Sequence, residues 1–529
     1  MLKDGKVWIA KNDAGEDIFL LPEMANRHGL IAGATGTGKT VTLKVMAEAF
    51  SDMGVPVFMA DVKGDLAGTI KAGADSEDMQ ARIERFGLAD AGFSYQGYPC
   101  TLYDIYGEKG IPLRTTVSEM GPVLLARILE LNELQTDVLS IVFKIADDNG
   151  LLLIDLKDLK SMLNYVNENS SAFAADYGKI MPATIGAIMR AVVALEVAGG
   201  DKFFGEPALN TSDWLAVGEG GKGMISILDS ESLINNGKLY STFLLWLLSE
   251  LFELLPEVGD LPKPKLIFFF DEAHLLFKDT PKSLMDKIEQ VVKLVRSKGV
   301  GVYFVTQTPK DIPDGVLSQL GNKVQHALRA YTPADQRAAK AAATAFRVNP
   351  AFDTYDTLLE LGTGEALVSV LGEDGIPGMV EKCAILPPQS FMGAISDTER
   401  DQAIKMSLLY GKYATPEDPD SAYEFLLRMG LEKEEQAAQA AAEAEAAKEA
   451  ALEAKELAKE EARLAKEKER EQREKERAMR QVASSATGTI GRKVGQTVGG
   501  TFGSFGKTLG GNVGASLGRG LLSTLFPKK

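Results

Sequence analysis

Eight consecutive residues near the N-terminus have the types and spacing that phosphate binding requires. Residues 33–40 read Gly-Ala-Thr-Gly-Thr-Gly-Lys-Thr and match the pattern G-x-x-x-x-G-K-[ST]. In such a loop the glycines let backbone N–H groups turn toward an anion, the lysine neutralises β- and γ-phosphate oxygens, and the threonine holds Mg²⁺. We therefore predict a nucleotide site for ATP or GTP with Mg²⁺. Its predicted residues are Gly33, Ala34, Thr35, Gly36, Thr37, Gly38, Lys39, Thr40 and Val41.

The segments on either side of this loop fit the elements that such a loop needs. Residues 29–32 form a short apolar run, as expected of a buried strand, and residues 41–50 have helical spacing. The N-terminus of that helix would face the anion. Strand, loop and helix are in register, which argues against a chance Gly/Thr-rich turn.

A second group of candidate residues follows an apolar run. Residues 266–274 read Leu-Ile-Phe-Phe-Phe-Asp-Glu-Ala-His. We predict that Asp271 anchors the hydrated Mg²⁺ and that Glu272 polarises the attacking water. An acidic strand end is a weak signal by itself, but it becomes strong beside the phosphate-loop motif.

Two further polar residues follow predicted strands. Residues 302–306 are mostly apolar and end at Gln307, which in a parallel sheet would lie near Asp271 and could sense the γ-phosphate or orient water. An ordinary hydrogen-bonding role for Gln307 stays open. Asp61 follows a strand predicted over 56–60, at the edge where ligands collect in open α/β sheets, and is a candidate contact to the metal's water shell. A solvated turn explains Asp61 equally well.

Short apolar runs alternate with helical segments along most of the chain. Strands are predicted at 29–32, 56–60, 223–228, 266–270, 301–306 and 323–328, and helices at 239–254, 282–297 and 333–346. This alternation predicts a three-layer α/β domain with a predominantly parallel sheet. Helical segments at 121–131, 134–147, 156–167 and 184–198 interrupt the pattern and indicate an all-helical insert. The predicted divisions are an ATPase core over 1–114 and 216–425, the insert over 115–215, and two C-terminal segments over 426–482 and 483–529.

The two C-terminal segments differ sharply in composition. Residues 431–482 are almost entirely Ala, Glu, Lys, Arg, Gln and Leu, which predicts a solvated helical spacer. Its leucines at 452, 457 and 464 are too sparse for a well-specified coiled coil. Residues 483–529 carry six basic and no acidic residues, with glycines recurring every four positions. A flexible tail and a self-associating or membrane-surface hairpin both fit that pattern.

Composition restricts the setting. The chain has 529 residues, a net charge of −16 and only two cysteines, Cys100 and Cys383, which suit neither a disulfide framework nor a zinc site. No run of about 18 apolar residues is present, so no transmembrane helix is expected, and we predict a cytoplasmic protein. The acidic balance argues mildly against broad nucleic-acid binding, although a narrow basic pore would be masked by the sum.

Several motifs in this order resemble one superfamily. Asn-Arg-His-Gly-Leu at 26–30, Asp-Val-Lys-Gly-Asp at 61–65, Phe-Asp-Glu-Ala-His at 270–274 and Thr-Gln at 306–307 resemble the HerA/FtsK superfamily of ring ATPases. The chain is most similar to bacterial HerA-like proteins of the DUF853 type, over roughly residues 15–400. This resemblance implies a RecA-like P-loop NTPase core, a hexamer, ATP as the nucleotide, and sites completed by a neighbour's arginine. It also implies relatives that pump or unwind DNA or feed secretion machines.

Two arginines are candidates for that neighbouring residue. Arg296 ends the helix before the Gln307 strand, and Arg329 follows the strand at 323–328. A surface salt bridge explains either one equally well. The chain also leaves too few residues before Gly33 for the β-barrel of DNA-exporting relatives.

Two functions therefore remain open. The first is an oligomeric ATPase that moves DNA or another polymer, and the second is a nucleotide-switched scaffold that gathers an unidentified partner protein or a membrane surface through residues 431–529. The first predicts hydrolysis that DNA stimulates and DNA binding that salt weakens, because phosphate contacts release counterions. The second predicts slow hydrolysis that is indifferent to DNA.

Overall fold

The structure is a computed structural model that describes residues 1–233, 237–259, 261–278 and 282–483. The chain divides into two compact units, Met1–Glu432 and Lys433–Lys529. The described part of the second unit, residues 433–483, lies within one helix, α17 (Ala422–Ala483). The predicted glycine-rich tail, apart from Ala483, lies outside the described residues.

A single sheet of 13 strands organises the first unit. Its parallel part contains the strands that were predicted around the site, and adjacent strands in it follow the order β11-β4-β10-β9-β5-β8-β6-β7. These strands are β11 (Asn322–His326), β4 (Gly29–Ala32), β10 (Val300–Thr306), β9 (Leu266–Phe270), β5 (Val57–Asp61), β8 (Ile225–Asp229), β6 (Cys100–Asp104) and β7 (Ile111–Pro112). The mostly parallel α/β architecture predicted from the sequence is therefore confirmed.

Antiparallel strands extend the sheet on the β11 side. They are β12 (Glu365–Ser369), β13 (Glu381–Ile385), β2 (Lys6–Asn12), β1 (Leu2–Lys3) and β3 (Asp17–Leu20). The register pairs Cys383 with Asn12 and Val324 with Val368. The N-terminal residues, for which no element was predicted, thus join the same sheet as the phosphate loop.

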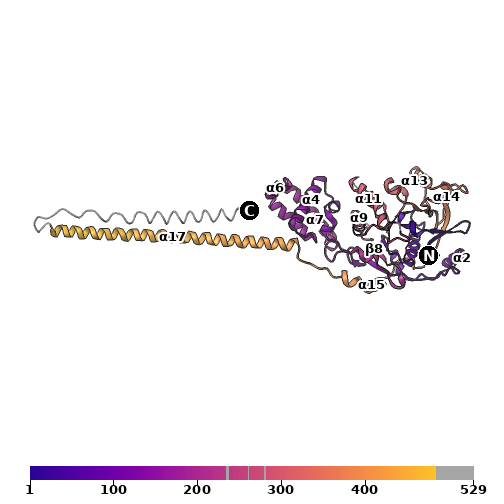
Figure 1. The fold of residues 1–529 in the computed structure, drawn as a ribbon, viewed down its shortest axis with the longest axis horizontal. Helices are drawn as coiled ribbons and strands as arrows, with labels where there is room; N and C mark the ends of the chain where they lie inside the picture. Colours follow the sequence, from indigo (N-terminus) through magenta and orange to yellow (C-terminus); the bar gives the residue numbers. More distant parts are fainter. Residues whose placement is uncertain (234–236, 260, 279–281, 484–529) are drawn as a thin grey trace. The chain divides into compact units, whose positions relative to one another are not determined.

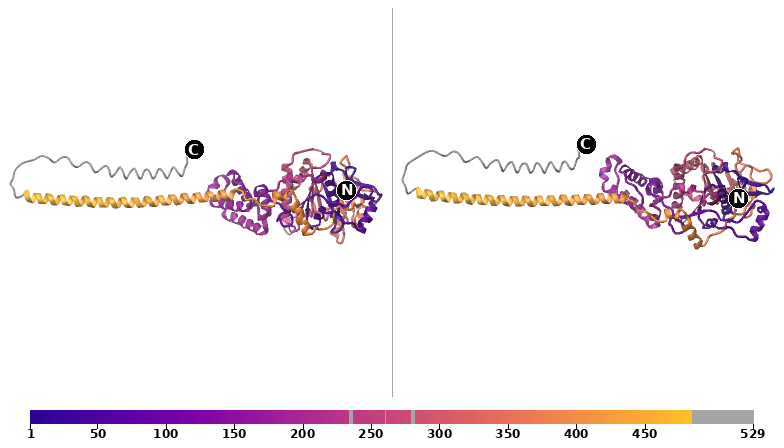
Figure 2. Two further views of the ribbon diagram at one scale, coloured as in Figure 1. Left: turned by 90° about the horizontal axis from the view of Figure 1, so that it is seen from below. Right: turned by 60° about the horizontal axis from the view of Figure 1, so that its bottom comes forward.

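Both faces of the parallel strands are buried. Alternate side chains along a strand point to opposite faces, so neighbouring residues belong to different cores. Ile31, Met59 and Phe269 belong to one core with residues of α1 (Lys39–Asp52), whereas Ala32, Phe58 and Phe268 belong to another. The second core also takes in α9 (Gly237–Leu254) and α11 (Lys282–Val295). Figures 1 and 2 show helices on either side of the strands.

Each of the four helices predicted between residues 121 and 198 is present with limits shifted by a few residues, and residues 129–131 lie outside the helices. The elements are α3 (Val117–Ile128), α4 (Glu133–Asp148), α5 (Leu156–Glu168), α6 (Ser170–Tyr177) and α7 (Pro182–Leu195). Capping boxes start α3, α4 and α5, so their first N–H groups are satisfied by local side chains. Contacts between α3 and α9 join this group to the sheet's helical layer.

One part of this group differs from expectation. The helical stretch Pro182–Phe203 is long and apolar enough to cross a bilayer, judged by length and composition only, with 28% of the scored window buried. The expectation that the chain contains no transmembrane helix is neither confirmed nor contradicted by this stretch. Ile185, Ile188 and Val192 on this stretch are buried in the core shared with α4 and α5.

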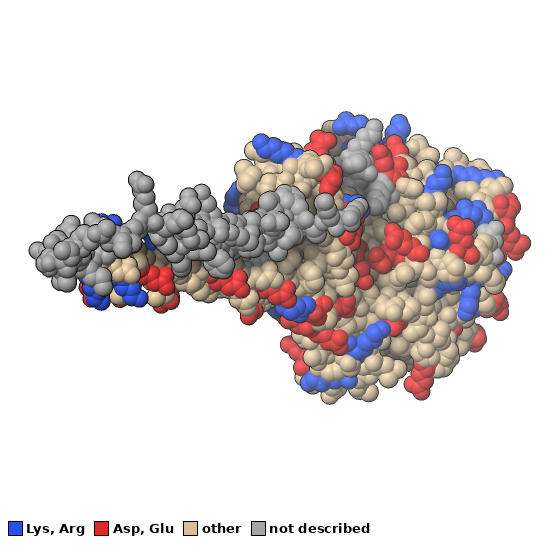
Figure 3. Space-filling model, turned by 60° about the vertical axis from the view of Figure 1, so that its left-hand side comes forward, with Lys and Arg blue, Asp and Glu red and all other residues tan. Residues whose placement is uncertain are grey.

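The remaining helices are short, apart from α17. They are α2 (Glu77–Phe86), α8 (Asp201–Phe203), α10 (His274–Phe277), α12 (Asp314–Leu317), α13 (Pro333–Thr344), α14 (Thr354–Glu360), α15 (Asp397–Met406) and α16 (Tyr410–Tyr413). In α17 the side chains of Leu452, Leu457 and Leu464 are all exposed, as a solvated helix predicts. Figure 3 shows acidic side chains spread over the visible face rather than gathered in one place.

Candidate nucleotide-binding and hydrolysis site

The phosphate-loop residues connect β4 to α1 and are fastened to two neighbouring strands. The Gly33 N–H donates to the Thr306 carbonyl at 3.2 Å, and the Ala34 N–H donates to the Ala327 carbonyl at 2.9 Å. Because Thr306 ends β10 and Ala327 follows β11, the loop sits at the carboxyl ends of three adjacent strands. This is the edge at which open parallel sheets bind ligands.

Two loop positions need glycine for both conformation and space. Gly33 and Gly38 have φ values of 155° and 115°, which L side chains rarely adopt. A Cβ at Gly33 would lie 2.5 Å from the Cβ of His326, and one at Gly38 would lie 3.3 Å from the backbone of Gly364. The loop is therefore packed directly on the segment that follows β11 and on the turn before β12.

Lys39 points back along its own loop. Its Nζ donates to the Gly33 carbonyl at 2.6 Å and to the Ala34 carbonyl at 3.1 Å. Burial, with a smaller contribution from the positive charge of Lys63, lowers the pKa of Lys39. The ammonium is held where phosphate oxygens can replace the two carbonyls. Lys39 starts α1, and Thr40 follows it in the first turn of that helix.

His326 packs directly beneath the phosphate loop, against Gly33, and we call it the floor of the loop. Its Nε2 lies 2.8 Å from the Thr42 hydroxyl, and its Nδ1 lies 3.0 Å from the Glu365 carbonyl. A carbonyl only accepts, so Nδ1 carries the proton and Nε2 accepts from Thr42. Burial and the nearby charge of Lys39 lower the pKa of His326 to about 4, so the ring is neutral near pH 7. No role for this residue was predicted.

The two predicted catalytic carboxylates lie at the end of β9. The Glu272 N–H donates to Asp271 Oδ1 at 2.9 Å, and the Tyr240 hydroxyl donates to the Asp271 carbonyl at 2.8 Å. Glu272 is buried and has φ 47°, a left-handed conformation that is strained for a residue with a side chain. His274 Nδ1 lies 3.3 Å from Glu272 Oε2 without hydrogen-bond geometry, so this buried oxygen has no hydrogen-bond partner among the described residues.

The charge state of Asp271 fits a cation at this place. Burial and the adjacent Glu272 raise the pKa of Asp271 to about 7, because two carboxylates side by side resist ionisation. A divalent cation would relieve that repulsion. The described residues contain no group of three or more His, Cys, Asp or Glu side chains arranged as a metal cage. Mg²⁺ is commonly held by one or two carboxylates together with substrate phosphates, which is a role that Asp271 could take here.

Gln307 lies between the two halves of the site. It follows β10, which pairs with β4 on one side and with β9 on the other. Thr306 is level with Ala32, and Phe304 is level with Phe270. The exposed Gln307 therefore stands at the edge between the phosphate loop and the Asp271–Glu272 pair, as the strand order required.

Comparison with known families matches residues 6–509 to the family described as Helicase HerA-like C-terminal. The chain belongs to this HerA-like family. It is 32% identical over 146 residues to a probable helicase, MJECL08, of Methanocaldococcus jannaschii, and 30% identical over 130 residues to the DNA double-strand break repair helicase HerA of Sulfolobus acidocaldarius. These matches span 27% and 24% of this chain, and 26% and 24% of the relatives.

A solved structure shares the fold of this HerA-like chain. The bacterial conjugative coupling protein TrwBdeltaN70 superposes with a TM-score of 0.51 at 14% identity, over 75% of this chain and 92% of that one. This likeness confirms the RecA-like fold. Within this fold, the phosphate loop and the acidic end of β9 have the arrangement of a P-loop nucleotide site.

Asp61, at the end of β5, holds together the turn that follows this strand. The Asp61 carboxylate accepts the backbone N–H groups of four residues in its own turn, at 63, 64, 66 and 67. Burial and the nearby Asp65 raise the pKa of Asp61 to about 6. Asp61 thus shapes the turn that carries Lys63, whose Nζ lies 3.9 Å from Glu272 Oε1. Lys63 was not predicted, although its place two residues after a central strand was a usable signal.

The two candidate arginines lie at opposite ends of the parallel strands, Arg296 at the amino ends and Arg329 at the carboxyl ends. Arg296 precedes β10 and is therefore at the amino edge, away from the phosphate loop of its own HerA-like chain. Arg329 follows β11 at the carboxyl edge and donates to the Leu359 carbonyl at 3.4 Å. The structure brings the phosphate loop, Asp271, Glu272 and Gln307 together, and it does not bring Arg296 to them.

Proposed function

We propose that this HerA-like protein is a Mg²⁺-dependent ATPase motor that assembles into a homo-oligomeric ring, a hexamer, and moves DNA through it. The observation that supports hydrolysis most directly is the side-by-side placement of three strand ends. The phosphate loop follows β4, Gln307 follows β10, and Asp271–Glu272 follow β9. All three meet at one sheet edge.

Each residue has a defined task in this proposal. The backbone N–H groups of residues 33–40 and the ammonium of Lys39 bind the ATP phosphates, and Thr40 and Asp271 hold Mg²⁺, which would offset the developing negative charge. Glu272, held in a left-handed conformation, orients the attacking water and takes its proton. Gln307 is placed to contact the γ-phosphate or that water.

Movement of DNA is supported by family membership and by the names of the two helicase relatives, whose matched regions cover about a quarter of each. The cytoplasm is the setting that we propose, in keeping with two free cysteines. The test is steady-state ATP hydrolysis with and without single- and double-stranded DNA, using Glu272→Gln as the blank. Stimulation by DNA of tenfold or more is expected, and hydrolysis that is indifferent to DNA would refute the translocation part alone.

A second candidate function rests on the separate C-terminal unit. The exposed helix α17 continues beyond the compact ATPase unit, which ends at Glu432. In a nucleotide-switched scaffold this segment and the tail would recruit a partner protein or a membrane surface. A chain ending at Glu432 should then keep hydrolysis but lose self-association or vesicle binding. Unchanged association after the truncation would exclude the scaffold.

A further inference from the structure

Two adjoining pockets lie at the amino edge of the parallel strands, opposite the phosphate loop. Each has a volume of about 400 Å³. Their walls come from residues just before β4 and β10, from the start of β11, and from the turns at 317–321 and 375–377. They share Ser318, Gly321 and Pro377. The hydrolysis site uses none of these residues.

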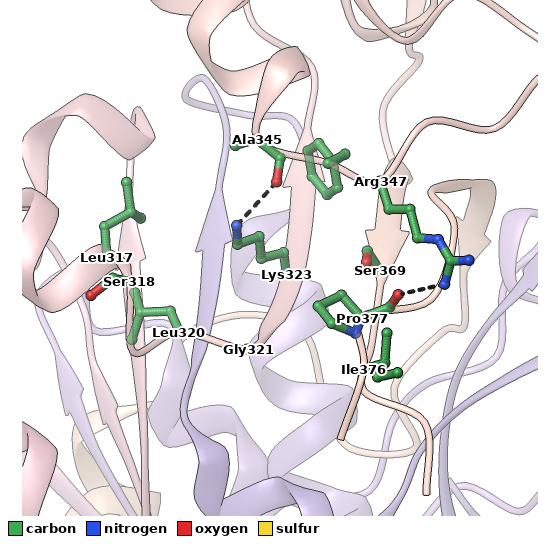
Figure 4. Close-up of a pocket in the computed structure, with 11 residues that line it drawn as sticks. Leu317, Ser318, Leu320, Gly321, Lys323, Ala345, Arg347, Ser369, Ile376 and Pro377 are labelled. Carbon is green, nitrogen blue, oxygen red and sulfur yellow. Dashed lines mark hydrogen bonds between the residues drawn. The ribbon is translucent and has the colours of Figure 1, made fainter. Parts of the chain in front are cut away.

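The first pocket, which we call the apolar-sided pocket, is drawn in Figure 4. Leu317 and Leu320 lie on one side of it, and Ile376 lies on the other (Figure 4). Two basic side chains also line it. Lys323 Nζ donates to the Ala345 carbonyl at 3.2 Å, and Arg347 Nη1 donates to the Pro377 carbonyl at 3.4 Å. Both cations are therefore held by neutral carbonyl groups.

The second pocket, which we call the basic pocket, is lined by Arg27, Lys293 and Arg296 together with His28, Gln319 and smaller residues. Its described lining contains no aspartate or glutamate. Burial lowers the pKa of His28 to about 4, so this ring adds no positive charge near pH 7. The charge of the basic pocket comes from the three long basic side chains.

Most of the basic side chains that line the two pockets lack an acidic partner among the described residues. Four of the five form no ion pair with a described carboxylate: Arg27, Lys293, Lys323 and Arg347. In addition, Arg27 Nε is buried without a hydrogen-bond partner in the described part of the chain. The protein has 74 acidic and 58 basic residues, so acidic side chains are more common than basic ones. The charged residues that line these two pockets are nevertheless all basic. An anionic ligand would neutralise these charges and satisfy the buried donor.

We propose that the two pockets together bind one nucleotide-like organic phosphate, with its phosphates in the basic pocket and its ring in the apolar-sided pocket. Arginine guanidinium groups match phosphate oxygens with two parallel hydrogen bonds. The apolar walls, and volumes in the range of small-molecule sites, suit a ring. The chain's own residues 484–529 are unsuitable occupants, because they carry basic and no acidic residues.

The test is equilibrium dialysis of radiolabelled ADP against the full chain carrying Lys39→Ala. This substitution disables the phosphate loop of every copy, so nucleotide held in another copy's loop cannot supply the signal. We expect saturable binding of about one ADP per chain, at least tenfold tighter than that of pyrophosphate. Citrate should compete poorly, since the site is expected to select phosphate.

Substitutions then assign the binding to the two pockets. Arg27→Ala in the Lys39→Ala chain should weaken ADP and pyrophosphate about tenfold, as loss of a charge-assisted hydrogen bond implies. Ile376→Ser, at a side chain that is 53% exposed, should weaken ADP and leave pyrophosphate unchanged. Arg337→Ala is the matched control, because Arg337 is exposed on α13 and lines neither pocket.

Two results would overturn the proposal. One is the absence of saturable ADP binding to the Lys39→Ala chain, and the other is equal binding by the Arg27→Ala and Arg337→Ala variants. Competition by citrate as strong as that by pyrophosphate would replace the phosphate with a carboxylate ligand and so reject the stated class. None of these readouts depends on hydrolysis, so they are separate from the test of the ATPase motor.

Discussion

Replacing His326 with asparagine tests whether the floor of the phosphate loop positions the nucleotide site. The imidazole bridges the Thr42 hydroxyl and the Glu365 carbonyl, at 2.8 and 3.0 Å. An asparagine side chain is too short to reach both, so one buried polar group loses its partner, at a cost of about 1–3 kcal/mol. The missing ring atoms also leave a small cavity beneath Gly33 and Gly38. We expect a lower stability and a fall of about tenfold in kcat/KM for ATP, which equals about 1.4 kcal/mol.

Tryptophan fluorescence is the suitable probe of unfolding for this variant. Trp8, Trp214 and Trp246 are all buried within the unit Met1–Glu432, so their fluorescence reports on that unit. Far-UV circular dichroism would instead contain a large contribution from the 62-residue helix α17. A chain of this size need not unfold in one step, so urea midpoints are compared rather than extrapolated free energies.

His28→Asn is the matched control. His28 is buried, accepts the Val302 N–H at Nδ1 over 3.0 Å, and has a pKa lowered by burial to about 4. It differs from His326 in lying at the opposite edge of the sheet. Both substitutions should lower the urea midpoint, but only His326→Asn should lower kcat/KM. Equal kcat/KM in the two variants, with His326→Asn no worse than wild type, would show that His326 is only a core residue.

Two further predictions concern the charges around the carboxylate pair. The pKa of Asp271 is raised to about 7 from its ordinary value of 3.8, so between these pH values the folded protein holds a proton that the unfolded chain releases. The contribution of Asp271 to the stability of the fold therefore falls as the pH rises from about 4 through 7. A cation must displace that proton, so the Mg²⁺ concentration needed for half-maximal ADP binding should fall between pH 6 and 8; a flat profile would contradict the assignment. The positive charge of Lys63 lowers the pKa of Asp271, so Lys63→Ala should move the acid limb of the pH–rate profile to higher pH. Lys71→Ala, at an exposed lysine paired with Glu399, should leave that limb in place.

The parts of the fold that the sequence predicted are those with local signals. The runs at 29–32 and 266–270 are short, apolar and bounded by turn residues, and they became β4 and β9 with the expected limits. Most of the antiparallel edge had no such signal. Pairing of β2 with β13 joins residues 10–12 to 383–385, and a single strand of mixed polarity does not reveal so distant a partner. Strand β6, with Thr101 and Asp104 among its residues, was missed for its mixed composition.

In the candidate site, too, the residues with a local sequence signal were predicted and those that depend on distant contacts were not. The phosphate loop, Asp271, Glu272 and Gln307 were found because each directly follows a strand of a recognisable kind. His326 contacts Thr42 across 284 positions of sequence, and only the β11–β4 pairing brings the two together. Asp61 was found at the correct edge, but its four backbone partners could not be inferred, because they depend on how the turn after β5 closes.

Arg296 and Arg329 lie at opposite ends of the parallel strands, and Arg296 also lines the basic pocket. Assembly of the proposed ring and binding of the proposed organic phosphate could therefore affect each other. If Arg296 completes a neighbour's hydrolysis site, the amino edge of one copy must face the phosphate loop of the next, which is a head-to-tail contact able to close into a ring. Arg296 also lines the basic pocket, so that contact and a bound organic phosphate would compete for one surface. ADP binding to the Lys39→Ala chain should then weaken as the protein assembles. If Arg329 acts instead, the amino edge stays available, and binding should be independent of protein concentration.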